Sequence, residues 1–463
     1  ESVPPSAHPI LTELGFLDAI RAGRFHPNRG NTVWWAGSEP RVEAFPEDRT
    51  GLHTDRARLE SVLRGAAERS GVEVRVGVSA RAARETDAGW VVRASRPQTE
   101  QTIRAAWVVD ATGRHGFLAR AEGREADRST TTLAIVRRWR RPGGWPDTAE
   151  GHTLVESYGE GWAWSVPLSS DVRCFTAMID QRRVDFGGDD LDTVLARELA
   201  ATRHLGGRLA GARPDGDAWA CPASLYTARR FGRPGLVLAG DAGSFIDPLS
   251  SYGVKKALSS GWLAGIVVHT CLTDPAMVDA ALDFFHARER SVWRSSRAAS
   301  AGFFEEAAAH HRSSFWTERA EAARRAPDAP EAQGAVASLD FGDPLEPPVP
   351  EGEVRAAFDR IRSRGVLDAR PGRTLRRLAR PGIEGNRLAM REHLASDRVP
   401  SGMRFVRGVD LTTLVAVAPE HETVPDGWTG YNGLAPPVPL PDYLTALATA
   451  FAAGLLEHDD SGS

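Results

Sequence analysis

One stretch of the chain puts a carboxylate at a position where α/β proteins bind their ligands. Residues 236–239 are apolar and predict a short buried strand, and the pair Gly240 and Asp241 follows it directly. In open α/β sheets, ligands bind just beyond the carboxyl ends of the strands. We therefore expect the Asp241 carboxylate to face a ligand at the edge of a sheet.

A helix is predicted to begin near the same edge. Gly253 opens a run over residues 254–268 that is apolar enough and long enough to form a buried helix. The N-terminus of a helix offers free N–H groups and a partial positive charge, which suit a group that becomes anionic. The turn before this helix supplies three further candidates for contact with the ligand: Pro248, Ser251 and Tyr252.

A second segment repeats the pattern of a strand followed by an aspartate. Residues 106–109 predict a buried strand, which is followed by Asp110, Thr112 and Gly113. Gly113 would let the backbone come close to a ligand because it has no side chain. The alternative is an ordinary β-turn in which Asp110 caps its own backbone. Two such turns, about 130 residues apart, favour a shared site.

The composition limits the classes of protein to consider. The chain has 463 residues, 41% hydrophobic and 25% charged, which is enough for two or three globular domains. The formal net charge of -4 argues against a nucleic-acid binder, and no apolar run is long enough to cross a membrane. The three cysteines lie far apart, which argues against a disulfide framework or a zinc motif and favours a cytoplasmic location: Cys174, Cys221 and Cys271.

The α/β alternation is lost between residues 130 and 184. An antiparallel sheet is predicted there, because Gly, Pro and Asp turns join four extended runs: 131–136, 153–157, 162–167 and 174–180. The period of a strand places Trp162 and Trp164 on one face. Their rings could keep water away from a ligand, or they could be two ordinary core residues.

The remaining pattern predicts further helices and strands. Helices are expected at 9–20, 51–70, 190–205, several times over 281–325, and at 353–364, 373–378 and 441–456. Strands are expected at 72–76, 90–93 and 102–105, with strand character at 405–417 and a turn region at 425–439. His310 and His311 point to different faces of a helix, which favours two surface histidines over an acid–base pair.

The two aspartate turns resemble the FAD motifs of flavin-dependent aromatic hydroxylases and, more closely, of the tryptophan-halogenase family. The segment Trp-Ala-Trp-Ser-Val-Pro at 162–167 is similar to a Trp-x-Trp-x-Ile-Pro marker of that family. The resemblance implies an α/β fold: an FAD-binding Rossmann-like domain of the glutathione-reductase type, an antiparallel β-sheet substrate domain and a small helical, winged-helix-like C-terminal domain. It also implies seven FAD-binding residues: Arg56, Asp110, Thr112, Gly113, Gly240, Asp241 and Gly253.

On this resemblance the chain divides into four parts. The FAD-binding domain is expected at 1–130 and 220–275, and the substrate sheet at 131–219. A helical segment at 276–330 would line the substrate side, and a linker rich in Pro and Ala at 326–350 would lead to the module at 350–463. That module would serve as a lid, or as a platform for a peptide or protein substrate.

The N-terminal end departs from the family pattern. The chain contains no G-x-G-x-x-G turn, which in the resembled family belongs to the first βαβ unit and binds the pyrophosphate of FAD. We expect that the sequence begins after that unit, and that as written it binds FAD poorly. The alternative is a protein that never held a dinucleotide.

The resemblance implies that reduced flavin and oxygen form a flavin hydroperoxide, which hydroxylates a ring or oxidises a halide. The sequence favours hydroxylation. The segment that matches the position of the halogenating lysine, residues 25–31, has no lysine, and the first lysine of the chain is Lys255. Arginine cannot replace that lysine, because it stays protonated. Tyr252 would also crowd the halide position.

We therefore expect an FAD-dependent monooxygenase that acts on a tryptophan-like or phenolic ring, free or bound to a peptide or carrier. Its electrons would come from a flavin reductase or NAD(P)H, and neither nucleic acid nor membrane would be a partner. A related flavin reductase or dehydrogenase is one alternative, and two others also stay open. One is a flavin-dependent halogenase, and the other is a degenerate flavoprotein that binds a protein or nucleic-acid partner without catalysis.

Overall fold

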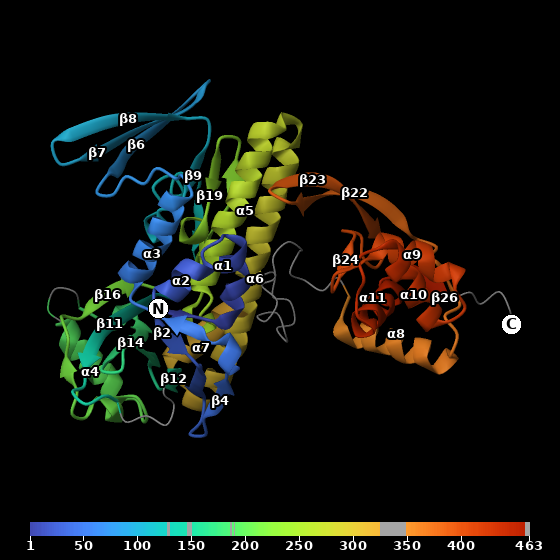
Figure 1. Ribbon diagram of the computed structural model, residues 1–463. Coiled ribbons are helices and arrows are strands. Elements are labelled where there is room, and N and C mark those ends of the chain that lie inside the picture. The colour runs from blue at the N-terminus through green and yellow to red at the C-terminus, as the bar shows by residue number, and fades with distance from the viewer. Residues whose placement is uncertain (127–129, 146–150, 186–187, 189, 325–348, 459–463) are drawn as a thin grey trace. The chain divides into compact units, whose positions relative to one another are not determined.

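The structure is a computed structural model that describes residues 1–126, 130–145, 151–185, 188, 190–324 and 349–458 (Figure 1). The chain divides into two compact units. The first unit comprises Glu1–Leu272 and Leu282–Phe341, and the second comprises Thr273–Ala281 and Gly342–Ser463. Apart from residues 349 and 350, the linker expected at 326–350 lies outside the described residues.

The largest sheet of the first unit has eight strands, in the order β15-β11-β14-β13-β12-β3-β4, with β16 paired to β11. Its strands are β3 Gly30–Trp34, β4 Arg41–Ala44, β11 Thr132–Arg140, β12 His152–Tyr158, β13 Gly161–Pro167, β14 Val172–Asp180, β15 Arg213–Pro214 and β16 Trp219–Pro222. The pairs that join β11 to β14, β14 to β13 and β13 to β12 are antiparallel, as predicted for this region. Only β12 and β3 pair in parallel.

Alternating side chains of this sheet pack in opposite directions, as the period of a strand requires. Leu133 and Ile135 belong to a cluster with Val194 and Leu199 of helix α4, Leu191–Ala200. The next residue along β11, Ala134, belongs instead to a cluster with residues of α6 and α7. The sheet is therefore covered by helices on both faces.

A second, three-stranded sheet carries the two aspartate turns. It consists of β9 Val108–Asp110, β18 Gly232–Arg233 and β19 Leu236–Leu238, and β9 pairs with β19 in parallel. Each parallel strand leads into a short 3₁₀ turn: η3 Gly113–His115 after β9, and η6 Gly240–Ala242 after β19. A third 3₁₀ turn, η7 Pro248–Ser250, precedes the long helix α5.

Smaller sheets and seven helices make up the rest of the described first unit. The strands are β1 Ser2–Val3, β2 His26–Asn28 and β5 Gly51–His53; β6 Ser79–Thr86, β7 Gly89–Arg96 and β8 Thr99–Ala105; and β10 Arg124–Ala126, β17 Tyr226–Ala228 and β20 Ser244–Phe245. The helices are α1 His8–Glu13, α2 Leu17–Ala22, α3 Arg56–Arg69, α4, α5 Gly253–Thr273, α6 Val278–His311 and α7 Ser314–Arg324. Helices α5 and α6 run side by side (Figure 1) and are joined by a hydrogen bond from Ser260 to Glu289.

The second unit has its own hydrophobic core, in which helices surround fully buried residues such as Tyr443 and Leu447. Its helices are α8 Glu351–Arg364, α9 Leu411–Val417, α10 Val424–Leu434 and α11 Leu440–Ala452. Its strands are β21 Ala369–Pro371, β22 Arg376–Glu384, β23 Arg387–Ala395, β24 Phe405–Val406, β25 Val409–Asp410 and β26 Leu456–His458. Strands β22 and β23 form a long hairpin that extends from the helices of this unit (Figure 1).

Two sequence predictions in the first unit are wrong. The single helix expected at 9–20 is two short helices, because Gly15 between them has a φ of +70°, which an α-helix does not allow. The strand expected at 72–76 is absent, and Val72 and Val76 are exposed. Their alternation is genuine, but without a neighbouring strand it cannot form a ladder.

Three predictions in the second unit are also wrong. The helix expected at 373–378 falls on β22, where Pro381 excludes a continuing helix and Gly385 makes the turn with a φ of +59°. Of the strand character at 405–417, only β24 and β25 are strands, and 411–417 is α9. The turn region at 425–439 contains α10, in which Thr423 caps the N-terminus and Pro425 occupies the first turn, where proline is tolerated.

Candidate flavin site

The two aspartate turns meet at one edge of the three-stranded sheet. Asp110 and Leu238 are register partners of β9 and β19, and the Ala239 amide donates a hydrogen bond to the Asp110 carbonyl oxygen at 2.9 Å. Because the two strands are parallel, both turns leave the sheet at its carboxyl edge. The prediction that these two segments fold together is confirmed.

The Asp110 carboxylate is fully used by its own turn. Its Oδ1 accepts hydrogen bonds from the Thr112 amide at 3.0 Å and the Thr112 hydroxyl at 2.6 Å. Its Oδ2 accepts from the amides of Leu118 and Ala119 at 2.7 and 2.9 Å. Burial acts to raise the pKa of Asp110, but these hydrogen bonds outweigh it and lower the pKa. The carboxylate therefore shapes the turn and presents Gly113, which has a φ of +64° and open space where a Cβ would stand.

Arg124 of strand β10 joins the two turns. Its guanidinium donates to the Arg114 carbonyl oxygen at 2.8 Å, in the first turn, and to the Ala242 carbonyl oxygen at 3.2 Å, in the second. The same group lies over the ring of Tyr226, whose hydroxyl donates to the Asp241 carbonyl oxygen at 2.6 Å. The sequence analysis missed Arg124 because it belongs to neither motif and lies in a three-residue strand.

Buried side chains of helices α5 and α6 hold the second turn in place. The Gly240 amide donates to Ser260 Oγ at 2.9 Å, and Ser260 Oγ donates to Glu289 Oε2 on α6 at 3.0 Å. Lys256 Nζ donates to the Gly240 carbonyl oxygen at 3.0 Å and also to the carbonyl oxygen of Ser244. Both polar groups of the Gly240 backbone are therefore fixed by buried side chains.

Asp241 differs from Asp110 in keeping its carboxylate available. Its side chain is 26% exposed, and the closest cation is Lys256, with 3.6 Å between Nζ and Oδ1. Arg56 lies near enough for the Asp241 charge to raise its pKa, but its guanidinium hydrogen-bonds mainly to Glu60, at 2.8 Å, and contacts Glu1 at 3.5 Å. The carboxylate of Asp241 can thus accept hydrogen bonds from a ligand.

The segment before α5 is held in an unusual conformation. Asp247 is buried, and its Oδ1 accepts a hydrogen bond from the Leu249 amide at 3.0 Å. Burial raises the pKa of Asp247 to about 6, although the Leu249 amide and the charge of Arg319 oppose this shift. Ser251 has a φ of +53°, in the left-handed region that residues other than glycine seldom adopt.

The first residue of α5, Gly253, faces open space. Nothing lies within 4 Å of the position that a Cβ on Gly253 would take. Tyr252, which precedes it, has a ring 5.4 Å from Lys255 Nζ. A helix of 21 residues therefore presents free N–H groups and its positive end beside the loop of Pro248, Ser251 and Tyr252.

Four tryptophans, Trp35, Trp162, Trp164 and Trp316, form an aromatic cluster between the large sheet and helices α6 and α7. The rings of Trp162 and Trp164 stack with centroids 4.9 Å apart, so the predicted common face is confirmed. Trp316 lies edge-on to Trp35, with centroids 5.3 Å apart. Two residues of the aspartate segment, Phe245 and Leu249, pack against this cluster, which places it next to the loop that precedes α5.

His311 also belongs to this region, which corrects the expectation of two surface histidines. His310 is exposed, but His311 is partly buried and stacks on Trp316. Its Nε2 lies 2.9 Å from Ser157 Oγ, which accepts a hydrogen bond from the Ala36 amide. Ser157 Oγ and His311 Nε2 therefore share a hydrogen bond, in which the tautomer of His311 decides which atom donates. Burial, and then the neighbouring His310, lower the pKa of His311.

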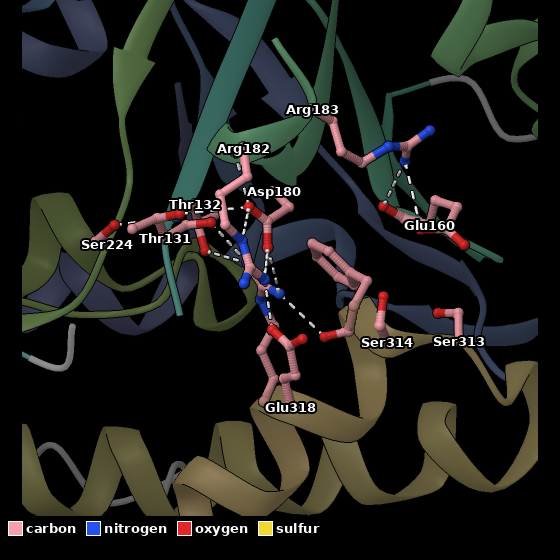
Figure 2. A network of polar contacts seen from close by, with 12 residues as sticks. Thr131, Thr132, Glu160, Asp180, Arg182, Arg183, Ser224, Ser313, Ser314 and Glu318 are labelled. Atoms are coloured by element: carbon pink, nitrogen blue, oxygen red, sulfur yellow. Dashed lines mark hydrogen bonds and ion pairs between the residues drawn. The ribbon is translucent and has the colours of Figure 1, made fainter. Parts of the chain in front are cut away.

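A polar network fixes helix α7 to the large sheet (Figure 2). The buried Arg319 donates to the carbonyl oxygens of Phe315 and Thr131, both at 3.0 Å, and to the Thr132 hydroxyl at 2.9 Å. Its Nη1 lies 3.9 Å from Asp180 Oδ2, and Arg182 contacts the same oxygen at 2.6 Å. The network holds α7, which carries Trp316, in position over the sheet.

The structure thus gathers most of the predicted site residues at one edge. Asp110, Thr112, Gly113, Gly240, Asp241 and Gly253 lie on the two turns and the start of α5, and Pro248, Ser251 and Tyr252 form the loop between them. Arg56 lies at the start of α3, close to Asp241. The residues that fix the second turn, Ser260, Lys256 and Glu289, were missed.

These residues fit a flavin. An available carboxylate, two open glycine positions and the positive end of a long helix surround one edge, and the Ser244 hydroxyl there is buried without a hydrogen-bond partner among the described residues. The described residues contain no group of three or more His, Cys, Asp or Glu side chains that could hold a metal ion. They also contain no helix that is both long and apolar enough to cross a membrane.

Comparison with known proteins identifies the family. A family model described as tryptophan halogenase matches residues 43–338. A tryptophan 2-halogenase of Chondromyces crocatus is 25% identical over 327 residues, which cover 68% of this chain and 62% of that protein. The flavin-dependent halogenase armH3 of Armillaria mellea is 23% identical over 330 residues and is covered to 64%. The chain therefore spans somewhat more than three fifths of the length of these relatives.

Solved structures support the fold. The flavin-dependent halogenase CmlS superposes with a TM-score of 0.75 at 20% identity, over 100% of this chain and 90% of that chain. The peptidyl tryptophan dihydroxylase QhpG superposes with a TM-score of 0.65 at 21% identity, over 98% of this chain and 90% of that chain. The fold is therefore shared by halogenating and hydroxylating proteins, and the predicted α/β class is confirmed.

Proposed function

We propose that this chain, which belongs to the tryptophan halogenase family, is an FAD-dependent monooxygenase that hydroxylates an aromatic ring, with tryptophan in a peptide or on a carrier as the favoured substrate. In this reaction one oxygen atom of O₂ enters an aromatic C–H bond and the other leaves as water. NAD(P)H supplies the two electrons, directly or through a flavin reductase, and bound FAD, when reduced, supplies the activation of oxygen.

The positions of the lysines favour hydroxylation over halogenation. The chain has two lysines, Lys255 and Lys256, and both are buried in the first turns of α5. Lys256 is held by backbone carbonyl oxygens, and Lys255 lies beside the Tyr252 ring. Residues 25–31, where the family resemblance expects the halogenating lysine, contain none. An amine that could carry an activated halogen to a substrate is therefore missing from that segment.

The residues of the site would bind and orient without taking part in bond making. Asp241 would accept hydrogen bonds from the ribityl chain, and Gly113 and Gly253 would allow the flavin to lie against the backbone. The N-terminus of α5 would stabilise negative charge on the pyrimidine side of the reduced flavin. The aromatic cluster would exclude water and stack against the ring of the substrate.

His311 is the titratable side chain of the aromatic cluster that could take up a proton. Burial, and then the neighbouring His310, lower the pKa of His311, which favours the neutral ring that a proton acceptor needs, and Nε2 lies within hydrogen-bond distance of Ser157 Oγ. We assign it the removal of the proton that leaves when the hydroxylated ring regains its aromaticity. Ser157 would hold the ring of His311 in place.

A second candidate is halogenation, which the family itself and the fold of CmlS favour. The two candidates separate in one experiment. The FAD-loaded protein is supplied with reduced flavin, isotope-labelled O₂ and tryptophan-containing peptides, with and without chloride or bromide. We expect a product that is heavier by one labelled oxygen and indifferent to halide. A halide-dependent product would assign the protein to the halogenases.

A further inference from the structure

The hairpin of the second unit carries an excess of positive charge on one face. Residues opposite each other in an antiparallel pair share a face. The register pairs Arg380 with Arg391, Leu378 with His393 and Glu384 with Arg387. One face of the hairpin therefore carries four arginines, one histidine and one glutamate: Arg376, Arg380, Arg387, Arg391, His393 and Glu384.

Two of the four arginines of this face have an ion-pair partner at short range, and two have none among the described residues. Arg391 contacts Glu384 at 2.9 Å, and Arg376 contacts Asp397 at 3.2 Å. Arg380 and Arg387 are exposed and have no ion-pair partner within the described ranges of the chain. Arg380 and Arg391 stand directly opposite each other, and like charges in that arrangement destabilise a hairpin. The ion pair between Arg391 and Glu384 offsets part of this repulsion, and Arg380 and Arg387 are left available for a contact outside the hairpin.

The charge on this face is complementary to an acidic partner. We propose that the face defined by Arg376, Arg380, Arg387 and Arg391, the arginine face, docks an acidic segment of the protein or peptide that presents the aromatic substrate. Guanidinium groups match carboxylates in shape and charge, and a carboxylate placed between Arg380 and Arg391 would turn their repulsion into attraction. The inference rests on the proposed function, which requires a substrate bound to a peptide or a carrier.

A protein partner fits this face better than a nucleic acid does. Proteins that bind single strands combine basic residues with aromatic rings that stack on the bases. Residues 376–395 contain no Phe, Tyr or Trp, and the chain as a whole has a net charge of -4. An acidic peptide needs only the carboxylate contacts, which the arginine face offers at positions four residues apart on each strand.

Binding can be measured on the full chain without flavin. The probe is a fluorescein-labelled peptide of alternating glutamate and serine, long enough to span the nine residues of β22. We expect fluorescence anisotropy to show binding that weakens as salt is added, since exposed ion pairs are screened. Peptides in which glutamine or lysine replaces glutamate should not bind.

The variant Arg380→Ala/Arg391→Ala separates docking from folding. We expect it to bind the acidic peptide about five- to tenfold more weakly, as two exposed ion pairs are lost. Its melting temperature should change little, because removal of the like-charge pair offsets the loss of the partly exposed ion pair between Arg391 and Glu384. The matched control is Arg360→Ala/Arg362→Ala on α8, which removes the same charge from two exposed arginines of the same unit and should leave binding unchanged.

Several outcomes would overturn the proposal. These are no binding of the acidic peptide, equal loss of binding in the control variant, or a marked drop in the melting temperature of Arg380→Ala/Arg391→Ala. Tighter binding of a single-stranded RNA of similar length would show that the face serves a nucleic acid instead. A failure of hydroxylation with intact peptide binding would count against the proposed function alone, because the binding assay requires no flavin.

Discussion

Lys256 Nζ lies 3.6 Å from Asp241 Oδ1, and the lysine side chain is 1% exposed. A charge buried this deeply needs several compensating contacts. It has them in the carbonyl oxygens of Gly240 and Ser244 and in the nearby carboxylates of Asp241 and Glu289. Burial lowers the pKa of Lys256 below its ordinary value, although the charges of these two carboxylates oppose the shift. Lys256, which lies in a segment that resembles a flavin motif, therefore fixes the turn that carries Asp241.

We expect the substitution Lys256→Met to destabilise the first unit by about 3–5 kcal/mol, because it leaves Glu289 and the Gly240 carbonyl oxygen buried without their cation. It should also weaken FAD binding and shift the visible spectrum of bound flavin. Urea unfolding followed by tryptophan fluorescence, together with FAD titration, measures both effects. The control Lys255→Met removes a cation from the neighbouring position and should leave the Gly240 turn intact.

A double variant tests whether Glu289 belongs to the same unit as Lys256. Lys256→Met/Glu289→Gln removes both buried charges, and its destabilisation should be smaller than the sum of the two single effects. Strict additivity would show that the lysine and the glutamate act independently. An unchanged flavin spectrum in Lys256→Met would show that the contacts of Lys256 do not affect the environment of the flavin.

Asp110 should matter to folding even when no flavin is bound. Its two carboxylate oxygens accept four hydrogen bonds from Thr112, Leu118 and Ala119. In Asp110→Asn the side-chain nitrogen replaces one of the two acceptor oxygens and faces N–H or O–H groups that also donate. We expect the free energy of unfolding to fall by about 1–3 kcal/mol per backbone amide left without an acceptor. Unfolding of the flavin-free protein measures this loss. Equal stability of variant and parent would instead assign the carboxylate to ligand binding.

The contrast between Asp110 and Asp241 shows how far the sequence could predict the site. Each lies at or just after the end of a short apolar strand, although only the strand before Asp241 is buried throughout, and this local pattern was enough to locate two turns at the same sheet edge. It could not show that Asp110 is saturated by amides of residues 118 and 119, because those contacts depend on how the chain returns after the turn. Lys256 was missed for a similar reason. Lysines in the first turn of a helix are usually solvated, and only the packing of α5 under the turn buries this one.

The wrong element predictions have the same origin. Residues 72–76 alternate like a strand, and residues 373–378 have a helical spacing. Each segment is too short for its pattern to decide between a helix, a strand and a loop. Tertiary context decides such short segments. The long runs of α5 and of β11 to β14 were predicted correctly, because the apolar pattern continues over many residues and the packing buries it, on both faces in the case of the sheet.

Arg319 and Arg182 contact the same carboxylate from different environments, which gives a direct comparison. The side chain of Arg319 is 4% exposed and that of Arg182 is 58% exposed, and both reach Asp180 Oδ2. Burial lowers the pKa of Arg319 to about 10, although the charges of Asp180 and Asp247 oppose the shift. We expect Arg319→Met to cost about 3–5 kcal/mol of stability and Arg182→Met no more than about 1 kcal/mol. Equal costs would show that the network is held by surface attraction alone.

Asp247 should make stability depend on pH in an unusual direction. Burial raises its pKa from 3.8 to about 6 in the folded protein, so between about pH 4 and pH 6 the folded state binds the proton more tightly than the unfolded state. Through this group, stability falls as the pH rises across that window. A shift of about two units corresponds to roughly 3 kcal/mol at most.

The substitution Asp247→Asn removes that dependence while keeping an oxygen that can accept from the Leu249 amide. We expect its stability relative to the parent protein to increase from pH 4 to pH 7 and to stay level above that. The control is Asp190→Asn at the exposed N-cap of α4, where hydrogen bonds from Thr193 and Asp192 lower the pKa of the carboxylate. Its stability relative to the parent should change in the opposite direction and mainly below the ordinary pKa of 3.8, so it should stay nearly level over most of the range from pH 4 to pH 7. Urea unfolding of both variants across this pH range provides the measurement. A relative stability of Asp247→Asn that does not change with pH would show that Asp247 ionises in the folded protein as readily as in the unfolded chain.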